Sequence, residues 1–321
     1  MQRAVELLKS GELVAFPTET VYGLGANALN SAAVDKIFKL KGRPYEDPLI
    51  VHIAGPEHLE LIAEPLSQAS SVMAHKLMKR FWPGPLTLVF KKKSCVPDNV
   101  TGGLDTVAVR VPQKLIALAL IRNCDFPLAA PSANRFQSMS PTTALDVEKE
   151  LGSEVLILDG GSCEVGVEST VLSFDNDHPV ILRHGGVTQE SLESVLGVKV
   201  KVGSKIKMAP GMMEFHYAPR KPLQVFSVGE FELFIKRKSK ALESGALLCF
   251  SKAEEKRFSK KGFKSVLVLS PRGRLEEAAT RLFGALRELD EGKATRIYAL
   301  EFPDGDLGVA LNDRLKKAQH K

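Results

Sequence analysis

The sequence predicts an α/β protein of two domains, and three observations support this fold class. Short apolar runs typical of strands alternate with helical patterns along the whole chain. Residues 203–222 interrupt the alternation with two Gly, three Pro and three Met and no regular period, which is typical of a linker. The length of 321 residues is sufficient for two domains of ordinary size.

The first predicted elements begin the larger domain. A helix over 2–9, closed by Gly11, precedes a strand that runs from Leu13 to Phe16. Ser31 is the expected N-cap of a helix over 31–41, which ends at Gly42. The elements expected next are a strand at 49–53, helices near 57–80, a turn at 82–85 and a strand at 86–92.

The rest of this domain has many strands close together, so we expect a mixed sheet rather than a purely parallel one. The expected strands lie near 106–111, 127–130, 154–159, 168–174 and 179–183. The expected helices lie at 113–122, 142–151 and 188–196.

The C-terminal part of the chain predicts a second, smaller α/β domain of the Rossmann-like kind. Its expected strands are 223–228, 246–250, 265–270 and 295–302, and its expected helices are 230–243, 275–290 and 307–319. We therefore divide the chain into a catalytic domain over 1–203, a linker or lid over 204–222 and a small domain over 223–321.

Composition excludes several classes of protein. Apolar residues at 44% and charged residues at 26% are ordinary for a globular chain, and no apolar run is long enough to span a membrane. Four distant cysteines predict neither a zinc site nor a disulfide scaffold, so no metal site is expected and the cytoplasm is the expected location. The net charge of +6 is compatible with an anionic partner or with solubility alone.

One glycine motif resembles a dinucleotide-binding loop but does not meet the requirements of one. Residues 23–28 fit the pattern GxGxxA, but Asn27 and Asn30 interrupt the helix that a dinucleotide site requires, so we predict a turn there. The chain also lacks the Walker, nucleophile-elbow and HExxH motifs. Any nucleotide must be bound by another kind of loop.

Cations and hydroxyl groups cluster beside the predicted strands instead. Lys41 and Arg43 lie at a helix end before Pro44, and two cations beside such a turn indicate an anion site. Arg110 lies inside an apolar strand, so it requires either an acidic partner or a substrate carboxylate. The loops add further polar groups: Thr18, Glu19, Thr20 and Tyr22, then Ser132, Asn134, Ser138 and Ser140, then Ser169 and Thr170, and finally Arg183.

In this order, the segments resemble the YrdC-like family in its two-domain form, the threonylcarbamoyl-AMP synthases. The similarity covers FPTETVYGLG, the KxRP of 41–44, PLIVH, WPGPLT, GLDTVAVRVP, the SxN pair with its SPT, GVEST and LR, across most of residues 10–190. The linker APGMMEFHYAPRKP and the tail LGVALNDRLKKA also resemble the long form. The resemblance implies a twisted, mixed, open sheet with flanking helices, followed by the small Rossmann-like domain.

The resemblance implies the substrates L-threonine, bicarbonate and ATP, with Mg²⁺ accompanying ATP, and the products threonylcarbamoyl-adenylate and pyrophosphate. A separate transferase complex would use the adenylate to modify the adenosine beside the tRNA anticodon. By residue matching, the threonine site comprises Thr20, His52, Arg110, Ala130 and Ser169. The ATP contacts comprise Arg43, Asp47, Thr106, Ser132, Ser140, Arg183, His216 and Tyr217. Lys41, Arg43, Ser132 and Asn134 are the implied catalytic group.

Three points stay open at this stage. A carboxylate such as Asp47 is costly beside a triphosphate unless it meets a metal, a cation or a ribose hydroxyl. An RNA-binding module is a competing hypothesis, and weak RNA binding is compatible with the basic charge. The hydrogenase-maturation branch of the family is disfavoured because its acylphosphatase domain and CxxC motifs are absent from this sequence. A regulatory homologue without catalytic activity is disfavoured because the KxR and SxN pairs are intact.

Overall fold

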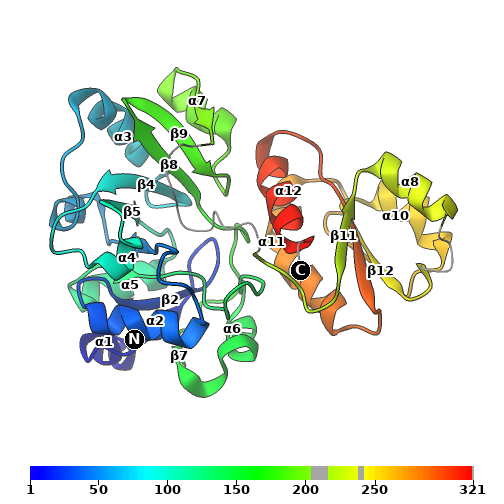
Figure 1. Cartoon of the computed structure of the whole chain (residues 1–321), viewed down its shortest axis with the longest axis horizontal. Helices are drawn as coiled ribbons and strands as arrows, with labels where there is room; N and C mark the ends of the chain where they lie inside the picture. The colour runs from blue at the N-terminus through cyan, green and yellow to red at the C-terminus, as the bar shows by residue number, and fades with distance from the viewer. Residues whose placement is uncertain (204–215, 238–241, 320–321) are drawn as a thin grey trace. The chain divides into compact units, whose positions relative to one another are not determined.

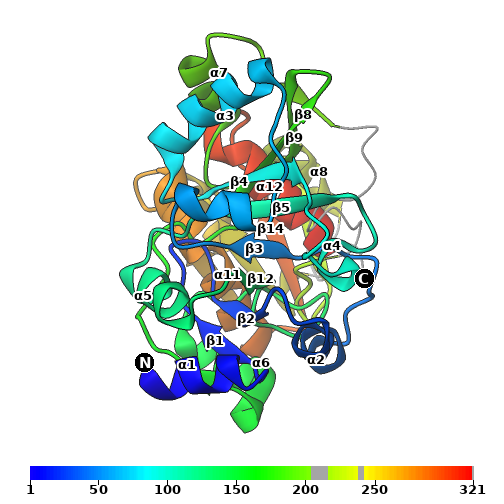
Figure 2. The ribbon, with the colours of Figure 1, turned by 90° about the vertical axis from the view of Figure 1, so that its left-hand side faces the viewer.

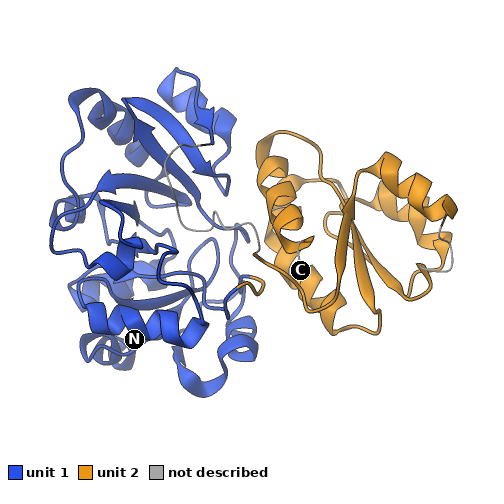
Figure 3. Ribbon diagram, viewed as in Figure 1, with its two compact units in different colours: residues 1–136, 140–212 blue, residues 137–139, 213–321 orange. Residues whose placement is uncertain are grey.

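The computed structural model describes residues 1–203, 216–237 and 242–319, and the chain divides into two compact units (Figure 3). Unit 1 comprises residues 1–136 and 140–212, and unit 2 comprises residues 137–139 and 213–321. The division between them lies within the segment predicted as a linker, of which residues 204–215 are outside the described residues. Gln137–Met139, which the sequence assigns to the first domain, groups with unit 2.

Unit 1 is built on a mixed sheet of ten strands (Figure 1). In chain order the strands are β1 (Val14–Phe16), β2 (Gly23–Asn27), β3 (Ile50–His52), β4 (Leu86–Lys91), β5 (Thr106–Arg110), β6 (Leu128–Ala129), β7 (Leu156–Ile157), β8 (Thr170–Asp175), β9 (His178–Arg183) and β10 (Lys201–Val202). Their spatial order is β10-β9-β8-β4-β5-β3-β6-β2-β1-β7. The sheet contains parallel pairs such as β3 with β5 and antiparallel pairs such as β4 with β5, so the expectation of a mixed open sheet is confirmed (Figure 2).

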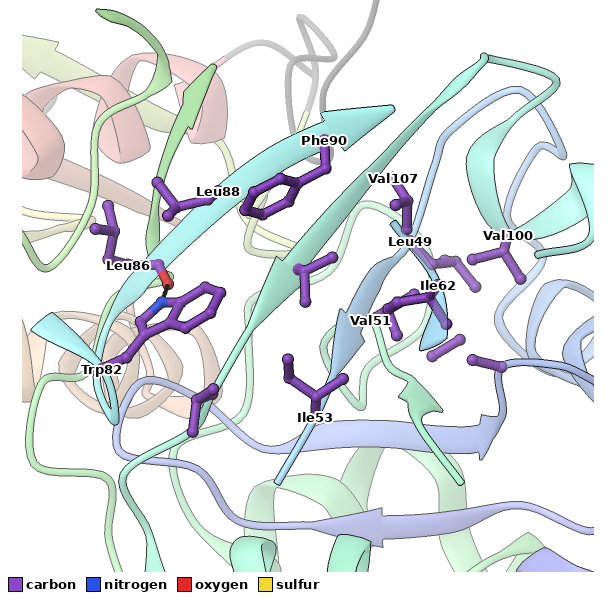
Figure 4. Packing of buried hydrophobic residues seen from close by; sticks show 14 of the residues in the cluster. Leu49, Val51, Ile53, Ile62, Trp82, Leu86, Leu88, Phe90, Val100 and Val107 are labelled. Carbon is purple, nitrogen blue, oxygen red and sulfur yellow. Dashed lines mark hydrogen bonds between the residues drawn. The ribbon is translucent and has the colours of Figure 1, made fainter. Parts of the chain in front are cut away.

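Helices flank both faces of this sheet. They are α1 (Gln2–Lys9), α2 (Ser31–Lys41), η1 (Pro56–Leu61), α3 (Gln68–Phe81), α4 (Asp98–Thr101), α5 (Leu115–Cys124), α6 (Ala144–Leu151), η2 (Gly152–Glu154) and α7 (Gln189–Leu196). The main core joins α2, α3 and α7 to one face, where Trp82 packs among Leu86, Leu88 and Ile53 (Figure 4). On the other face, α1 and α5 bury their apolar sides against β1 and β6.

Two local predictions in this unit are wrong. Gly23–Ala28 does not form a turn, because residues 23–27 are the strand β2, paired with β1 and β6. Glycine is required within this strand because a Cβ on Gly25 would lie 2.8 Å from the ring of Phe16. Helix α2 is capped by Asn30 rather than Ser31, since the Asn30 side chain accepts a hydrogen bond from the amide of Ala33.

Successive side chains along a strand point to opposite faces of the sheet, so residues two positions apart share a face. Val51 and Val109 point into the main core, whereas Ile50 and Ala108 belong to a second apolar cluster on the opposite face. His52 and Arg110 are each two residues further along the same strands. They therefore lie on this second face, and the register of β3 with β5 places them directly beside each other.

Unit 2 has a parallel sheet of four strands, as expected of a Rossmann-like domain. The strands are β11 (Leu223–Phe226), β12 (Gly245–Cys249), β13 (Ser265–Val268) and β14 (Arg296–Leu300), in the order β11-β14-β12-β13. The accompanying helices are α8 (Val228–Arg237), α10 (Lys252–Phe258), η3 (Ser259–Lys261), α11 (Leu275–Glu291) and α12 (Asp306–Gln319). Helix α10 was not predicted, although its start is signalled by Glu254, whose carboxylate accepts hydrogen bonds from the amides of Phe250 and Ser251.

No helix in the described ranges of either unit is both long and apolar enough to cross a bilayer.

Candidate active site

The KxRP segment positions one cation inside the protein. Helix α2 ends at Lys41 because Gly42 adopts a left-handed conformation, with φ of 66°. The buried Lys41 Nζ donates hydrogen bonds to the backbone carbonyls of Ser132, at 2.6 Å, and Asn134, at 2.5 Å. Burial, with a smaller contribution from Arg43, holds the pKa of Lys41 well below its usual value. Lys41 therefore connects the SxN loop to the end of α2.

Arg43 and Asp47 form a buried ion pair. Arg43 Nη2 lies 2.9 Å from Asp47 Oδ2, and the guanidinium also donates to the backbone carbonyls of Asp47 and Pro48. Both side chains are almost completely buried, at 5% and 3% exposure. The partner that makes a carboxylate tolerable at position 47 is therefore a cation of the protein itself.

Arg110 is oriented by contacts to each of its three nitrogen atoms. Nε donates to the carbonyl of Gly84 at 3.1 Å, and Nη1 donates to Thr20 Oγ1 at 2.9 Å. Nη2 lies 2.5 Å from Glu19 Oε1. A guanidinium has five N–H groups, and the hydrogen bonds to Gly84 and Thr20 use two of them. The planar guanidinium is the kind of group that binds a carboxylate in bidentate fashion.

His52 is a neutral imidazole next to this guanidinium. Burial, followed by the charge of Arg110, lowers the pKa of His52 from 6.5 to about 3, and hydrogen bonds to the backbone of Ile50 and Leu128 oppose this only partly. Phe16 packs edge-on against the ring, with centroids 6.0 Å apart. Within the part of the chain that the structure describes, Nδ1 of His52 has no hydrogen-bond partner.

A second polar group is built around Ser169. Its hydroxyl lies 2.7 Å from that of Thr87, and its backbone carbonyl accepts two hydrogen bonds from Arg183, through Nε and Nη2. Nη2 of Arg183 also donates to the Ser169 hydroxyl at 3.2 Å. Ser169, implied on the threonine side, and Arg183, implied on the ATP side, are therefore in direct contact.

The SxN loop is held by its backbone as well as by Lys41. Leu24 donates to the carbonyl of Pro131, and Ala133 donates to that of Tyr22, which aligns the loop with the start of β2. Ala130 extends the end of β6 through its own amide, which donates to the carbonyl of Ile50. Further along the loop, the hydroxyl of Ser140 donates to Glu168 Oε1 at 2.5 Å.

One of the implied residues, Thr106, lies apart from Arg110, and His216 and Tyr217 belong to unit 2. Thr106 begins β5 four residues before Arg110, and a strand rise of about 3.3 Å per residue places their Cα atoms roughly 13 Å apart. The described contacts of His216 and Tyr217 lie within unit 2: His216 donates through its amide to the carbonyl of Lys317, and Tyr217 packs on Phe283.

Sequence reasoning named Glu19 among the polar groups of its loop without identifying it as the partner of Arg110, and it did not single out Glu168. Both are buried, and each contacts a residue that the sequence had singled out, Arg110 and Ser140 respectively. The signal for Glu19 was available, because a buried arginine requires a carboxylate partner and Glu19 lies in a loop already regarded as ligand-binding. No sequence pattern indicated that Glu168 would face Ser140.

The arrangement suits binding and charge stabilisation. Among residues 1–203, 216–237 and 242–319, no group of three or more His, Cys, Asp and Glu side chains is placed to hold a metal ion. Burial raises the pKa of the nearby Cys163 thiol to about 12, so this cysteine is not an activated nucleophile. What the site offers is fixed cations, hydroxyl groups and a neutral histidine.

The fold and these residues define a two-domain α/β protein whose larger unit holds buried cations in contact with carboxylates, hydroxyl groups and backbone carbonyls. Residues 6–185 match the Sua5, YciO and YrdC family model, described as "Telomere recombination". Residues 187–319 match the model of the C-terminal domain of threonylcarbamoyl-AMP synthase. The chain belongs to the Sua5/YciO/YrdC family and has both domains of its two-domain threonylcarbamoyl-AMP synthases, which are transferases.

Individual relatives agree with this assignment. The threonylcarbamoyl-AMP synthase of Bacillus subtilis is 45% identical over 98% of this chain and 92% of its own length. The crystal structure of Pyrococcus abyssi Sua5 with L-threonine has a TM-score of 0.87 and 41% identity, covering 99% of this chain and 93% of that one. A putative threonylcarbamoyl-AMP synthase of Methanocaldococcus jannaschii is 32% identical over 60% of this chain and 90% of its own length.

Proposed function

We propose that this protein makes L-threonylcarbamoyl-adenylate from L-threonine, bicarbonate and ATP, releasing pyrophosphate. The observation that carries the proposal is the buried guanidinium of Arg110, which is oriented by Gly84, Thr20 and Glu19. Such a fork matches the carboxylate of an amino acid. The name of the family and the threonine bound to P. abyssi Sua5 support threonine as that amino acid.

The threonine side of the site is assigned to Arg110, His52, Thr20, Ala130 and Ser169. Arg110 binds the carboxylate, while neutral His52 accepts or donates a hydrogen bond without adding charge beside the amine. An imidazolium at this position would repel both Arg110 and a protonated amine. Keeping His52 neutral therefore allows the protonated amine of threonine to bind beside it without repulsion from the ring.

The ATP side is assigned to Arg43, Ser132, Ser140 and Arg183, with Thr106, Asp47, His216 and Tyr217 as further contacts. Lys41 and Asn134 complete the catalytic group through the SxN loop, whose backbone Lys41 holds. Since the described residues lack a cluster of metal ligands, Mg²⁺ enters as part of the MgATP substrate, with phosphate oxygens and water as its ligands.

The chemistry requires no nucleophile from the protein. The threonine amine attacks the carbon of carbon dioxide released from bicarbonate, forming an N–C bond and losing a proton to solvent. A carbamate oxygen then attacks the α-phosphorus of ATP, the bond from that phosphorus to the bridging oxygen breaks, and pyrophosphate leaves. Fixed cations lower the barrier by stabilising charge on phosphate, and orientation of the two substrates supplies the rest.

The adenylate is a reactive product, and we assign its consumption to a separate transferase complex that modifies tRNA beside the anticodon. We also propose that the reaction takes place in the cytoplasm, where ATP and tRNA are available. A structure of P. abyssi Sua5 exists with an adjacent histidine and tyrosine replaced by alanine, and His216–Tyr217 is the one adjacent His-Tyr pair in this sequence.

Pyrophosphate release tests the proposal when ATP, L-threonine and bicarbonate are supplied singly, in pairs and together. The expected result is release only with all three, together with a threonylcarbamoyl-adenylate that mass spectrometry detects. Release from ATP that is indifferent to threonine would contradict the substrate assignment. RNA binding in a gel shift that ATP and threonine cannot compete, without pyrophosphate release, would favour the RNA-binding alternative.

A further inference from the structure

Glu19 is a buried carboxylate that the assigned reaction does not use directly. Its side chain is 3% exposed, and its two oxygens have different partners. Oε1 lies 2.5 Å from Nη2 of Arg110, while Oε2 accepts a hydrogen bond from the amide of Gln113 at 2.9 Å. Gln113 lies three residues after the end of β5, the strand that carries Arg110. Glu19 therefore connects the Arg110 guanidinium to the backbone just beyond that strand.

The backbone around Glu19 is also held in place. Its carbonyl accepts a hydrogen bond from the amide of Val165 at 2.8 Å, so the Gly-rich segment before Ser169 is tied to the same residue. Glu19 lines a groove of about 550 Å³ together with Gln113, Lys114 and Glu164. At this groove Lys114 and Glu164 form a partly exposed ion pair of 2.5 Å. The Glu164 carboxylate can therefore serve as a control for that of Glu19.

We propose that Glu19 is a positioning residue for threonine binding, which holds the Arg110 guanidinium in the orientation that receives the substrate carboxylate. Three partners hold the three nitrogens of Arg110, and only Glu19 among them carries charge. Its negative charge also balances the buried guanidinium while the threonine site is empty. This inference rests on the assignment of Arg110 to the threonine carboxylate.

The variant Glu19→Gln removes the charge and one acceptor oxygen of the side chain but keeps its size. A glutamine has one acceptor oxygen, so it cannot accept from both Arg110 and the Gln113 amide, and its NH₂ group then faces one of these donors. We expect the Kd and KM for L-threonine to rise about tenfold or more, while those for ATP change by about twofold at most. The kcat at saturating threonine should change by less than about threefold.

Two further variants make the test specific. Glu19→Asp retains both oxygens and the charge but is shorter, so its threonine Kd should lie between those of the wild type and Glu19→Gln. Glu164→Gln removes the exposed carboxylate of the same groove and should leave both affinities unchanged. Isothermal titration of L-threonine and of ATP, together with pyrophosphate release, provides the measurements.

The outcomes distinguish this inference from the proposed function. Wild-type protein that neither binds threonine nor releases pyrophosphate in its presence contradicts the proposed function. Wild-type protein that does both, with Glu19→Gln unchanged or with threonine and ATP weakened equally, contradicts the positioning role of Glu19. If Glu19→Gln does not fold, Glu19→Asp decides, because the inference requires its threonine Kd to rise more than its ATP Kd.

Discussion

At the residue scale, the most informative pair is Arg43 with Asp47. The position of Arg43 in the KxRP segment indicates a phosphate-binding group, yet the structure shows a side chain that is also part of the protein interior. Its guanidinium contacts a buried carboxylate and two backbone carbonyls. Removing it therefore affects both ligand binding and folding.

We expect Arg43→Ala to lower the free energy of unfolding by about 3 kcal/mol as well as abolishing turnover, because it leaves the Asp47 carboxylate buried without its cation. Urea denaturation measures the first effect and pyrophosphate release the second. In the double variant Arg43→Met with Asp47→Leu, most of the stability should return while activity stays absent. A fully stable Arg43→Ala protein would show that the pair does not contribute to folding.

His52 predicts a dependence of stability on pH. Its pKa is about 3 in the folded protein, against 6.5 for an unperturbed histidine, so below pH 6.5 the unfolded chain takes up a proton that the folded protein refuses. The stability contribution is thus complete above pH 6.5 and is lost as the pH falls towards 3. We expect the loss to be about 2 kcal/mol by pH 5.

The measurement is the free energy of unfolding by urea at pH 7 and pH 5. His52→Gln should remove this part of the pH dependence, whatever it does to stability at pH 7. His178→Gln, at an exposed position on β9, should retain the wild-type dependence. Equal slopes for the wild type and His52→Gln would mean that His52 is not buried in its neutral form.

At the element scale, the turn after β9 depends on close backbone approach. A Cβ on Gly185 would lie 2.2 Å from the carbonyl oxygen of Glu168 and 2.4 Å from the carbonyl carbon of Ser169. These are backbone atoms of the GVEST segment, so they cannot move aside as a flexible side chain does. The glycine thus allows Arg183 at the end of β9 to reach Ser169.

We expect Gly185→Ala to destabilise the protein by about 2 kcal/mol or more and to weaken substrate binding, because the GVEST backbone must shift. The matched control is Gly284→Ala, within α11, where an added Cβ meets no atom within 4 Å. That control should be neutral or slightly stabilising, since alanine favours a helix over glycine by about 1 kcal/mol. Thermal unfolding compares the two, and equal melting temperatures would contradict the close approach.

At the scale of the whole molecule, each unit has an apolar core of its own. Among the residues that the structure describes, the buried members of three clusters belong to unit 1 and extend up to Val200. The buried members of another cluster belong to unit 2 and begin with Phe231.

A fragment of residues 1–203 is therefore expected to fold without the rest of the chain. The single tryptophan, Trp82, is buried in unit 1 and reports on its core by fluorescence. The fragment should show the emission of a buried indole and a single cooperative urea transition. Gln137–Met139 is the part expected to differ, since its hydrogen bonds come from Ala218 and Arg287. Fluorescence of an exposed indole without a cooperative transition would contradict this prediction.

Most of the fold was predictable from local patterns. Periodicity and capping residues predicted the helices over 2–9 and 31–41 and the four strands of the small domain, because an element's own sequence decides which side is apolar and where it ends. The strand β2 was missed because glycine-rich sequences favour turns, and its extended form depends on the strands on either side and on the Phe16 ring above Gly25. That information is not local.

By itself, the sequence determined the fold class, the family and the residue types of the site, since each follows from short motifs in order. The tertiary structure alone decided which groups contact each other: Glu19 with Arg110, Asp47 with Arg43, Glu168 with Ser140 and Lys41 with the SxN carbonyls. Each of these pairs except Arg43 with Asp47 joins residues at least 28 positions apart. Their charges and hydrogen bonds must be satisfied where water is excluded, and only the packing of distant strands and loops determines which partner is within reach.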